Sequence, residues 1–365
     1  MTSKLQVLSQ ELRMHRGAVS DREALEILIL YVTNHCNMKC EHCFFADNLN
    51  DGTTDLSPER AKRIFDSIPR IREEIAITGG EPILHRKLPE LVRNIHDAEC
   101  SRDIQINTNG WYVDRTLEYA KDIKQWNRKR ISFQISLDGL EETHDRIRGL
   151  EGSFQRAMET AENLKSLSHY SEPGFFTPVF LMVINSQNYR EVRPLAEFLF
   201  REFGLFLAIE LVRGTQFSVW NVPEGMLEDD FNPPSLELPP ESEWDSIYED
   251  LRALNREWGY PFRHFATKMK YQFEMLRTQK RVVRCAAPSG VTPVVYANGD
   301  VATCEFAKPF ANLNEFGDDF SALWNSDRAR QNRAALTGCH CTHACFLVPS
   351  LRRDLGKNFK LLVDL

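Results

Sequence analysis

The feature that most constrains the fold is a regular alternation of apolar runs with stretches of helical periodicity. The apolar runs have the length of buried strands, and turn-forming residues follow them. This alternation is typical of a parallel sheet whose strands are joined by helices. It predicts an α/β fold, a partial (β/α)6 barrel, with strands over 26–33, 74–78, 103–108, 130–137, 175–184 and 205–212, and helices over 57–67, 87–98, 113–125, 152–167 and 188–203.

Three cysteines stand in one short segment directly after the first apolar run. Their spacing is Cys36-x3-Cys40-x2-Cys43. Cysteine thiolates hold 4Fe–4S clusters, which normally take four of them, so three would leave one iron open to a small molecule. Zinc is an alternative, because it accepts mixed ligand sets in which His35 or His42 would be the fourth ligand. A disulfide is a weaker interpretation, since residues 1–24 are polar and charged rather than a secretory signal.

Short turn-forming segments also follow the next three predicted strands. They are Gly79-Gly80-Glu81-Pro82, Asn107-Thr108-Asn109-Gly110 and Ser136-Leu137-Asp138-Gly139. Taken alone, each segment would be only a turn or a cap. Glycine at a strand end also permits unusual dihedral angles and close contact with a ligand. Because active sites of parallel barrels lie at the C-terminal ends of the strands, one rim should collect these segments and the three cysteines.

Together, the sequences CNMKCEHC and GGEP resemble the radical S-adenosylmethionine (radical SAM) superfamily. The resemblance implies a radical SAM barrel in which the three cysteines hold a 4Fe–4S cluster and SAM binds at its open iron. It also implies that Asn109 and Ser136 contact the ribose or carboxylate of SAM, and that Arg148 pairs with the carboxylate, for which a guanidinium is well suited. The cofactor contacts implied in this way are Gly79, Gly80, Glu81, Pro82, Asn109, Ser136, Arg148, His42 and Leu211.

A second group of cysteines stands in the C-terminal part of the chain. Its members are Cys285, Cys304, Cys339, Cys341 and Cys345. Asn298-Gly299, between the stretches 291–297 and 300–305, predicts a β-hairpin. The spacing Gly299-x4-Cys304 resembles the SPASM and shorter twitch domains, small hairpin-plus-helix domains that carry auxiliary iron–sulfur clusters behind a radical SAM barrel.

The number of C-terminal cysteines favours one auxiliary cluster over two. The full SPASM pattern supplies seven cysteines for two clusters, whereas this chain has five after residue 284. The preferred ligands are Cys285, Cys304 and Cys345, with Cys341 ahead of Cys339 as the fourth. A zinc site that uses His340 or His343 is the alternative, because the same ligand types serve both metals.

These patterns divide the chain into five segments. They are an N-terminal extension over 1–24, the barrel over 25–213, an acidic, proline-rich loop with bridging helices over 214–280, the auxiliary-cluster domain over 281–350, and a tail over 351–365. Within the third segment, the aromatic and leucine spacing predicts helices over 244–258 and 265–276. The stretch 214–242 reads as a long loop or lid, which in compact domains is usually functional or flexible.

The resemblance implies that a reduced flavodoxin or ferredoxin donates an electron and that SAM is cleaved to a 5'-deoxyadenosyl radical, which abstracts hydrogen from an unactivated carbon. A small metabolite such as a sugar or cyclitol, undergoing oxidation or epimerisation, ranks ahead of a ribosomal peptide, because 24 N-terminal residues are too few for a peptide-binding domain. A non-catalytic iron–sulfur or zinc protein is the alternative from another class.

The composition and the hydrophobic pattern argue against two further classes of protein, nucleic-acid-binding and membrane-spanning proteins. The net charge of −7 and the pI near 5.9 argue against nucleic-acid binding, which favours a basic face. No apolar run approaches the length of a membrane span. We therefore expect a cytoplasmic enzyme.

Overall fold

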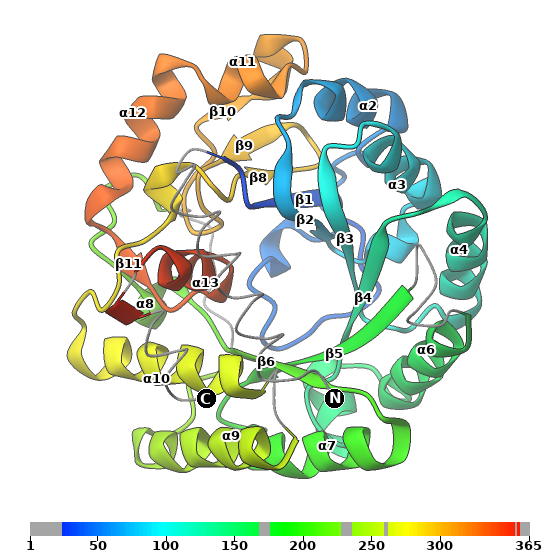
Figure 1. Cartoon of the computed structure of the whole chain (residues 1–365), viewed down its shortest axis with the longest axis vertical. Coiled ribbons are helices and arrows are strands. Elements are labelled where there is room, and N and C mark those ends of the chain that lie inside the picture. Colours follow the sequence, from blue (N-terminus) through cyan, green and yellow to red (C-terminus); the bar gives the residue numbers. More distant parts are fainter. Residues whose placement is uncertain (1–23, 168–175, 228–235, 259–261, 355, 358–365) are drawn as a thin grey trace.

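The fold is built on a nine-stranded sheet in which six consecutive strands are parallel neighbours (Figure 1). The computed structural model describes residues 24–167, 176–227, 236–258, 262–354 and 356–357. The six strands are β1 (Ile27–Thr33), β2 (Ile71–Gly79), β3 (Ser101–Thr108), β4 (Arg130–Ser136), β5 (Phe176–Ile184) and β6 (Leu207–Leu211). They lie side by side in chain order. The predicted parallel α/β fold is confirmed.

Helices surround the sheet on its outer side (Figure 1). They are α2 (Pro58–Ser67), α3 (Leu88–Asp97), α4 (Val113–Trp126), α5 (Glu141–Arg148), α6 (Ser153–Leu167), α7 (Val192–Phe198), α9 (Trp244–Trp258) and α10 (Phe262–Thr278). The start of α2 follows from its sequence, because the Ser57 side chain accepts a hydrogen bond from the Arg60 backbone N–H and Pro58 occupies the first turn. Ile64 and Phe65 on its inner face are buried against the sheet.

Two helical regions differ from the sequence prediction. α5 was not predicted, because its buried face includes His144 and Arg148 and therefore lacks an apolar stripe. The helix expected over 188–203 is divided into a 3-10 turn at Tyr189–Glu191, the helix α7, and a π-helical turn at Leu199–Phe203. Gly204 closes the last turn with a left-handed φ of 61°.

The predicted hairpin extends the main sheet. It consists of β8 (Val294–Val295) and β9 (Asp300–Ala302), with β10 (Ala311–Asn312) beside β9. Its strands are shorter than expected, and β8 begins after Pro293, which has no N–H to donate to a ladder. β8 pairs in parallel with β1. The hairpin therefore places Cys304 beside the strand that leads into the first cysteine group.

The remaining elements complete the C-terminal region. They are α8 (Thr215–Ser218), β7 (Val219–Trp220), α11 (Phe320–Trp324), α12 (Asp327–Ala335), β11 (His340–Cys341) and α13 (Ala344–Arg353). β7 lies in the stretch predicted as a loop or lid, where we expected no strand, and it pairs antiparallel with β11. A two-residue strand formed by pairing with a segment about 120 residues later has no local signature.

Several predicted segments fall partly outside the described residues. These are most of the extension over 1–24, the first residue of the strand over 175–184, residues 228–235 of the acidic loop, and most of the tail over 351–365. The five segment boundaries stay predictions.

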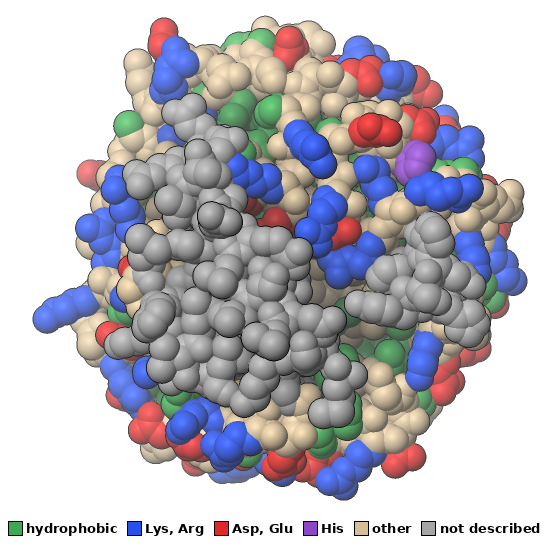
Figure 2. Space-filling model, viewed as in Figure 1, with side chains coloured by type: hydrophobic (Ala, Val, Ile, Leu, Met, Phe, Trp, Pro, Cys, Tyr) green, Lys and Arg blue, Asp and Glu red, His purple; other side chains and the backbone are tan. Residues whose placement is uncertain are grey.

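The surface of the described residues mixes charges of both signs. On the face shown in Figure 2, Lys and Arg side chains gather near the centre with Asp and Glu among them. The ion pair between Arg130 of β4 and Asp103 of β3, at 2.7 Å, joins one side chain of each sign. Among the described helices, none combines the length and the apolar character that a membrane span requires.

Candidate active site

The first cysteine group lies in the loop that leaves β1, at the C-terminal end of the strand. Asn50 fixes the start of this loop, because its side chain accepts a hydrogen bond from the Cys36 N–H at 3.2 Å and donates one to the Cys36 carbonyl at 3.1 Å. Within the loop, the Met38 N–H donates to the Cys36 sulfur at 3.5 Å. Cys36, Cys40 and Cys43 are all half-buried. The structure therefore presents three soft sulfur ligands from one restrained loop.

Burial keeps these thiols from ionising in the absence of a cation. It raises the pKa of Cys36 to about 12 and that of Cys43 to about 11. Arg148 is the main opposing influence at Cys40, with its guanidinium 3.6 Å from the sulfur. A sulfur donor set in a partly desolvated loop suits a metal cluster that brings its own positive charge. The residues present thus fit a 4Fe–4S cluster.

The Gly79-Gly80 pair packs directly against the backbone of the cysteine loop. A Cβ on Gly79 would lie 2.2 Å from the Thr33 carbonyl oxygen, and one on Gly80 would lie 2.3 Å from the His35 carbonyl oxygen. The Gly80 N–H donates to Thr33 at 2.8 Å, and the Glu81 N–H donates to His35 at 2.7 Å. Both glycines are therefore required by the contact between the end of β2 and the residues that precede Cys36.

Glu81 joins the ends of β2 and β3. Its carboxylate is buried and accepts hydrogen bonds from the Ile83 N–H at 3.0 Å, the Thr108 hydroxyl at 2.8 Å and the Asn109 N–H at 2.6 Å. Burial raises its pKa to about 7, and these hydrogen bonds oppose the rise. The Asn109 side chain in turn donates to Asn37 at 2.9 Å, within the cysteine loop. Glu81 and Asn109 thereby hold the loop from the next two strand ends.

Asp138 is the centre of a second buried contact set, which meets the loop at His42 and, through Arg148, at Cys40. Its fully buried carboxylate lies 2.6 Å from Arg148 Nε and 3.7 Å from His42 Nε2, and it accepts a hydrogen bond from the Val183 N–H at 2.9 Å. Although burial raises its pKa, the charge of Arg148 is the largest of the opposing influences, and together they lower the pKa. His42 and His144 have pKa values lowered to about 4, chiefly by burial, and are neutral at pH 7.

The other predicted SAM contacts lie along the same edge of the sheet. Ser136 is the last residue of β4 and is half-buried, and Leu211 is the last residue of β6 and is buried. Arg148 ends α5 and pairs with Asp138 rather than standing unpaired. Pro82 is buried at the start of a 3-10 turn that follows Glu81. The structure thus collects these residues at the rim, while their contacts with SAM stay predictions.

Four of the C-terminal cysteines interact with one another, and the fifth, Cys345, packs against the same apolar cluster as Cys285 and Cys304. The Cys285 and Cys339 thiols are hydrogen-bonded to one another, which lowers the pKa of Cys285 and raises that of Cys339. Cys304 and Cys341 both interact electrostatically with Cys285. The Cys285 and Cys304 sulfurs also accept hydrogen bonds from backbone N–H groups two residues later, each at 3.4 Å. The sequence prediction had preferred Cys345 to Cys339.

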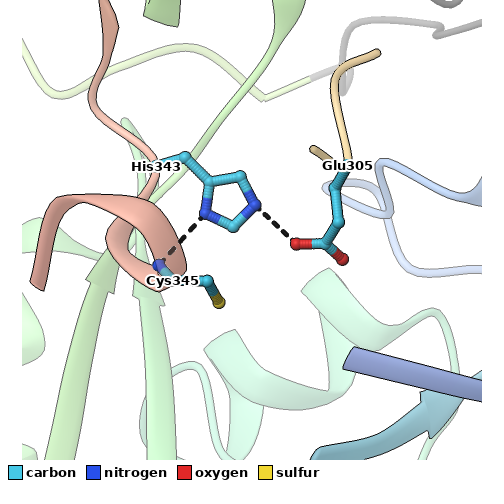
Figure 3. Close-up of side chains that lie close together, drawn as sticks. All are labelled: Glu305, His343 and Cys345. Carbon is cyan, nitrogen blue, oxygen red and sulfur yellow. Dashed lines mark hydrogen bonds and ion pairs between the residues drawn. The ribbon is translucent and has the colours of Figure 1, made fainter. Parts of the chain in front are cut away.

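Cys345 belongs to a buried polar cluster with Glu305 and His343 (Figure 3). One ligand atom from each of the three lies within 4.8 Å of the others. The His343 ring stands between the Cys345 backbone nitrogen, at 3.3 Å, and the Glu305 carboxylate, at 2.6 Å (Figure 3). Three such donors could suit a metal ion. However, the Arg213 guanidinium already lies 3.3 Å from the Glu305 carboxylate and 3.0 Å from His343 Nδ1, and a second cation there would be repelled.

Arg213 also reaches the first cysteine loop. Its guanidinium carbon lies 3.7 Å from the centre of the Phe44 ring, next to Cys43 in sequence. Glu305, next to Cys304, accepts a hydrogen bond from the Tyr31 hydroxyl of β1 at 2.5 Å. Burial raises the pKa of Glu305, but Arg213 and His343 overcome this and hold it at about 2. The two cysteine groups are therefore joined by a continuous set of buried contacts.

The histidines considered as zinc ligands have other partners. His35 is half-exposed and lies 4.0 Å from Asp55. The His340 ring stacks on Trp220 with ring centres 5.3 Å apart, and His343 is bonded to Glu305. His42 faces Asp138, although its Nδ1 is buried without a hydrogen-bond partner. These contacts favour sulfur-only ligand sets.

Sequence reasoning missed the roles of Asp138 and of the contact set Tyr31, Arg213, Glu305 and His343. Asp138 had been noted only as a turn residue. The position of Glu305, directly after the candidate ligand Cys304, could have indicated such contacts. If that cysteine is buried, the neighbouring carboxylate is buried too and needs a partner of opposite charge. Tyr31 within an otherwise apolar strand is a second indication, since a buried tyrosine hydroxyl usually finds a partner.

Comparison with known proteins agrees with this geometry. Residues 30–199 match the family model described as the Radical SAM superfamily. Over these residues, the chain is therefore similar to radical SAM domains.

Two curated relatives show how far the likeness extends. The Fe-coproporphyrin III synthase of Methanosarcina barkeri is 30% identical over 177 residues, which are 48% of this chain and 41% of that protein. The sporulation killing factor maturation protein SkfB of Bacillus subtilis is 27% identical over 329 residues, which are 86% of this chain and 68% of that protein. The first match therefore spans about two fifths of its relative, whereas the second extends into the C-terminal cysteine region.

Solved structures share the fold. Streptococcus suis SuiB bound to the precursor peptide SuiA has a TM-score of 0.59 at 15% identity, covering 88% of this chain and 70% of SuiB. Native anSMEcpe with bound AdoMet has a TM-score of 0.56 at 18% identity, covering 84% of this chain and 83% of that chain.

Proposed function

We propose that this protein is a radical SAM enzyme whose SAM-binding cluster is held by Cys36, Cys40 and Cys43. The observation that carries the proposal is the packing of Gly79 and Gly80 onto the backbone just before Cys36, within a domain of the radical SAM family. Bound together, a 4Fe–4S cluster and SAM supply a 5'-deoxyadenosyl radical that can remove hydrogen from an unactivated carbon.

The protein's own residues position these groups. Glu81 and Asn109 restrain the cysteine loop from one side, and Arg148 places a positive charge beside Cys40 on the other. Ser136 and Leu211, at the ends of β4 and β6, are the proposed contacts for the ribose and adenine of SAM. The buried rim would exclude water from the reacting centre and orient the substrate carbon.

We also propose one auxiliary iron–sulfur cluster, held by Cys285, Cys304, Cys339 and Cys341. Cys339 packs in one cluster with Cys285 and Cys304, and Cys341 packs in another with Cys304, which supports this set. A 4Fe–4S cluster normally takes four cysteine ligands, so this set would leave no iron open for substrate. The auxiliary cluster would then exchange electrons rather than bind substrate.

For the substrate, a peptide is the better-supported proposal. SkfB, whose match covers 86% of this chain, is by name the maturation protein of a sporulation killing factor, and SuiB shares the fold in complex with a precursor peptide. The sequence alone ranked a small metabolite first. That alternative keeps support from the Fe-coproporphyrin III synthase, whose likeness is confined to about half of this chain.

Anaerobic reconstitution with iron and sulfide tests the proposal. We expect about eight irons per chain and formation of 5'-deoxyadenosine when SAM and dithionite are added. The matched control is a variant with Cys36, Cys40 and Cys43 all changed to Ala, which should retain about four irons and form no 5'-deoxyadenosine. Bound zinc and no SAM cleavage by the wild-type protein would overturn the proposal.

Incubation with candidate substrates then separates the substrate classes. The candidates are a short peptide encoded beside the gene and a panel of sugars and cyclitols. A peptide that loses two hydrogens, or exchanges one with solvent deuterium, in step with 5'-deoxyadenosine formation would support peptide maturation. The same behaviour in a sugar or cyclitol, with the peptide unchanged, would favour the small-metabolite alternative.

A further inference from the structure

A cavity of about 790 Å³ opens beside the first cysteine loop. It lies where the chain enters α2, α3 and α4, and its lining includes Cys36, His85, Arg86, Lys87, Tyr112 and Arg115. Cys36 is the member of the three-cysteine group that lines it. The cavity therefore gives access from the surface to one edge of the proposed SAM-binding cluster.

This cavity is separate from the proposed SAM contacts. Ser136, Arg148 and Leu211 lie at the ends of β4, α5 and β6, and none of them is among the residues that line it. The lining instead comes from the segments after β1, β2 and β3. Apart from Cys36, the lining therefore shares no residue with the proposed cluster ligands and SAM contacts.

The mouth of the cavity is basic although the chain as a whole is acidic. Arg86 and Lys87 are exposed, and Arg115 is half-exposed above the Tyr112 ring at 5.3 Å. The carboxylate in the lining is Asp55, and Glu59 approaches Lys87 at 4.0 Å. With a net charge of −7, the remaining surface would repel an acidic protein, whereas this mouth would attract it. The site therefore favours a negatively charged partner at the edge of the cluster.

We propose that this basic mouth is the docking surface for an acidic one-electron carrier protein, such as a reduced flavodoxin or ferredoxin. The proposal rests on the proposed function, which requires one electron to enter the cluster for each SAM cleaved. In the docked complex the carrier is oxidised by one electron and the cluster is reduced by one. No bond forms or breaks, and the side chains serve only to hold the carrier near Cys36.

Charge reversal at the mouth tests the docking surface. The test variant is R86E/K87E, and the matched control is K270E/K280E, which reverses two exposed lysines that do not line the cavity. The measurement is the second-order rate constant for anaerobic cluster reduction by reduced flavodoxin at several salt concentrations. We expect R86E/K87E to lower this rate constant by about tenfold or more at low salt and to flatten its salt dependence, because steering by charge is screened by ions.

Two further measurements keep this test independent of the proposed function. Iron content and the extent of cluster reduction by excess dithionite should be the same in both variants and the wild type. If dithionite supports SAM cleavage but R86E/K87E is reduced by flavodoxin as fast as the control, the docking proposal is wrong while the proposed function stands. If dithionite supports no cleavage in the wild type, the proposed function fails first.

Discussion

The two cysteine groups are assembled in different ways. The first comes from one loop, so its three sulfurs are brought together by local backbone contacts and by the end of β2. The second draws Cys285, Cys304, Cys339 and Cys341 from three separated segments, two of which are placed by the strand pairs β8–β9 and β7–β11. A local sequence motif can therefore reveal the first site. The ligands of the second site are brought together only in the folded chain.

The electrostatic settings of the two groups also differ. Beside the first group, Arg148 stands between the Cys40 sulfur and the buried carboxylate of Asp138. Beside the second group, the Cys285 and Cys339 thiols share a hydrogen bond, and Glu305 is compensated by Arg213. Each site thus has its own buried ion pair. Arg213 belongs to both settings, since it also packs on Phe44.

The largest expected difference follows from removing one ligand at each site. Cys40→Ala should abolish 5'-deoxyadenosine formation and remove about four irons per chain, because SAM would lose the cluster to which it binds. Cys304→Ala should lose a similar amount of iron but retain the first cluster and dithionite-driven SAM cleavage without normal substrate turnover. Iron analysis and the deoxyadenosine assay check both variants. Normal substrate turnover by Cys304→Ala would show that the auxiliary cluster is not essential.

Gly80→Val should be nearly as damaging to the first site and harmless to the second. The added Cβ would meet the His35 carbonyl oxygen at 2.3 Å, so the backbone before Cys36 must move, at a cost of about 1–3 kcal/mol or more. We expect reduced iron at the first cluster and weakened SAM binding as a consequence.

Gly338→Val is the matched control, because a Cβ there meets nothing within 4 Å although the residue precedes Cys339. Iron content after reconstitution and thermal unfolding compare the two variants. Wild-type iron content and SAM affinity in Gly80→Val would contradict the packing argument.

The same contrast explains what could be predicted from the sequence. The strands β1 to β6 and the helix α9 follow from apolar periodicity, and α9 has the predicted bounds. The location of Cys36, Cys40 and Cys43 at a strand end follows equally from local pattern. The pairing of β8 with β1 and the grouping of Cys339 with Cys285 depend on contacts between residues far apart in sequence. Alternation of residue types carries no information about such pairings.

A smaller effect separates Cys339 from Cys345. If Cys285, Cys304, Cys339 and Cys341 form the auxiliary site, Cys339→Ala should lower iron content by up to four atoms per chain, whereas Cys345→Ala should leave it unchanged. The side chains with the strongest electrostatic influence on Cys345 are Glu305, Arg213, Glu210 and Lys268, which are not cluster ligands of the usual kind. Iron analysis and electron paramagnetic resonance of the reduced proteins make the comparison. Loss of the auxiliary signal in Cys345→Ala alone would restore the ligand set favoured by the sequence.

The smallest effect on iron content is expected from a change at Arg213, which tests whether the two sites are electrostatically independent. Burial raises the pKa values of Cys43, Cys304 and Cys345, and the Arg213 charge opposes the rise at all three. A positive charge near both clusters stabilises their reduced, more negative forms. Arg213→Met should therefore lower the reduced-to-oxidised ratio of both clusters at a fixed potential, by about tenfold for a unit charge roughly 10 Å away.

The variant also removes the guanidinium that pairs with the buried Glu305 carboxylate, and breaking a buried ion pair costs about 3–5 kcal/mol of stability. The double variant R213M/E305Q removes both charges and is the control, and its potentials and stability should lie closer to those of the wild type. Redox titration followed by electron paramagnetic resonance reports the two clusters separately. If R213M shifted the potential of the auxiliary cluster alone, the contact with Phe44 would carry no electrostatic coupling, and the two cysteine groups would be independent in charge as well as in assembly.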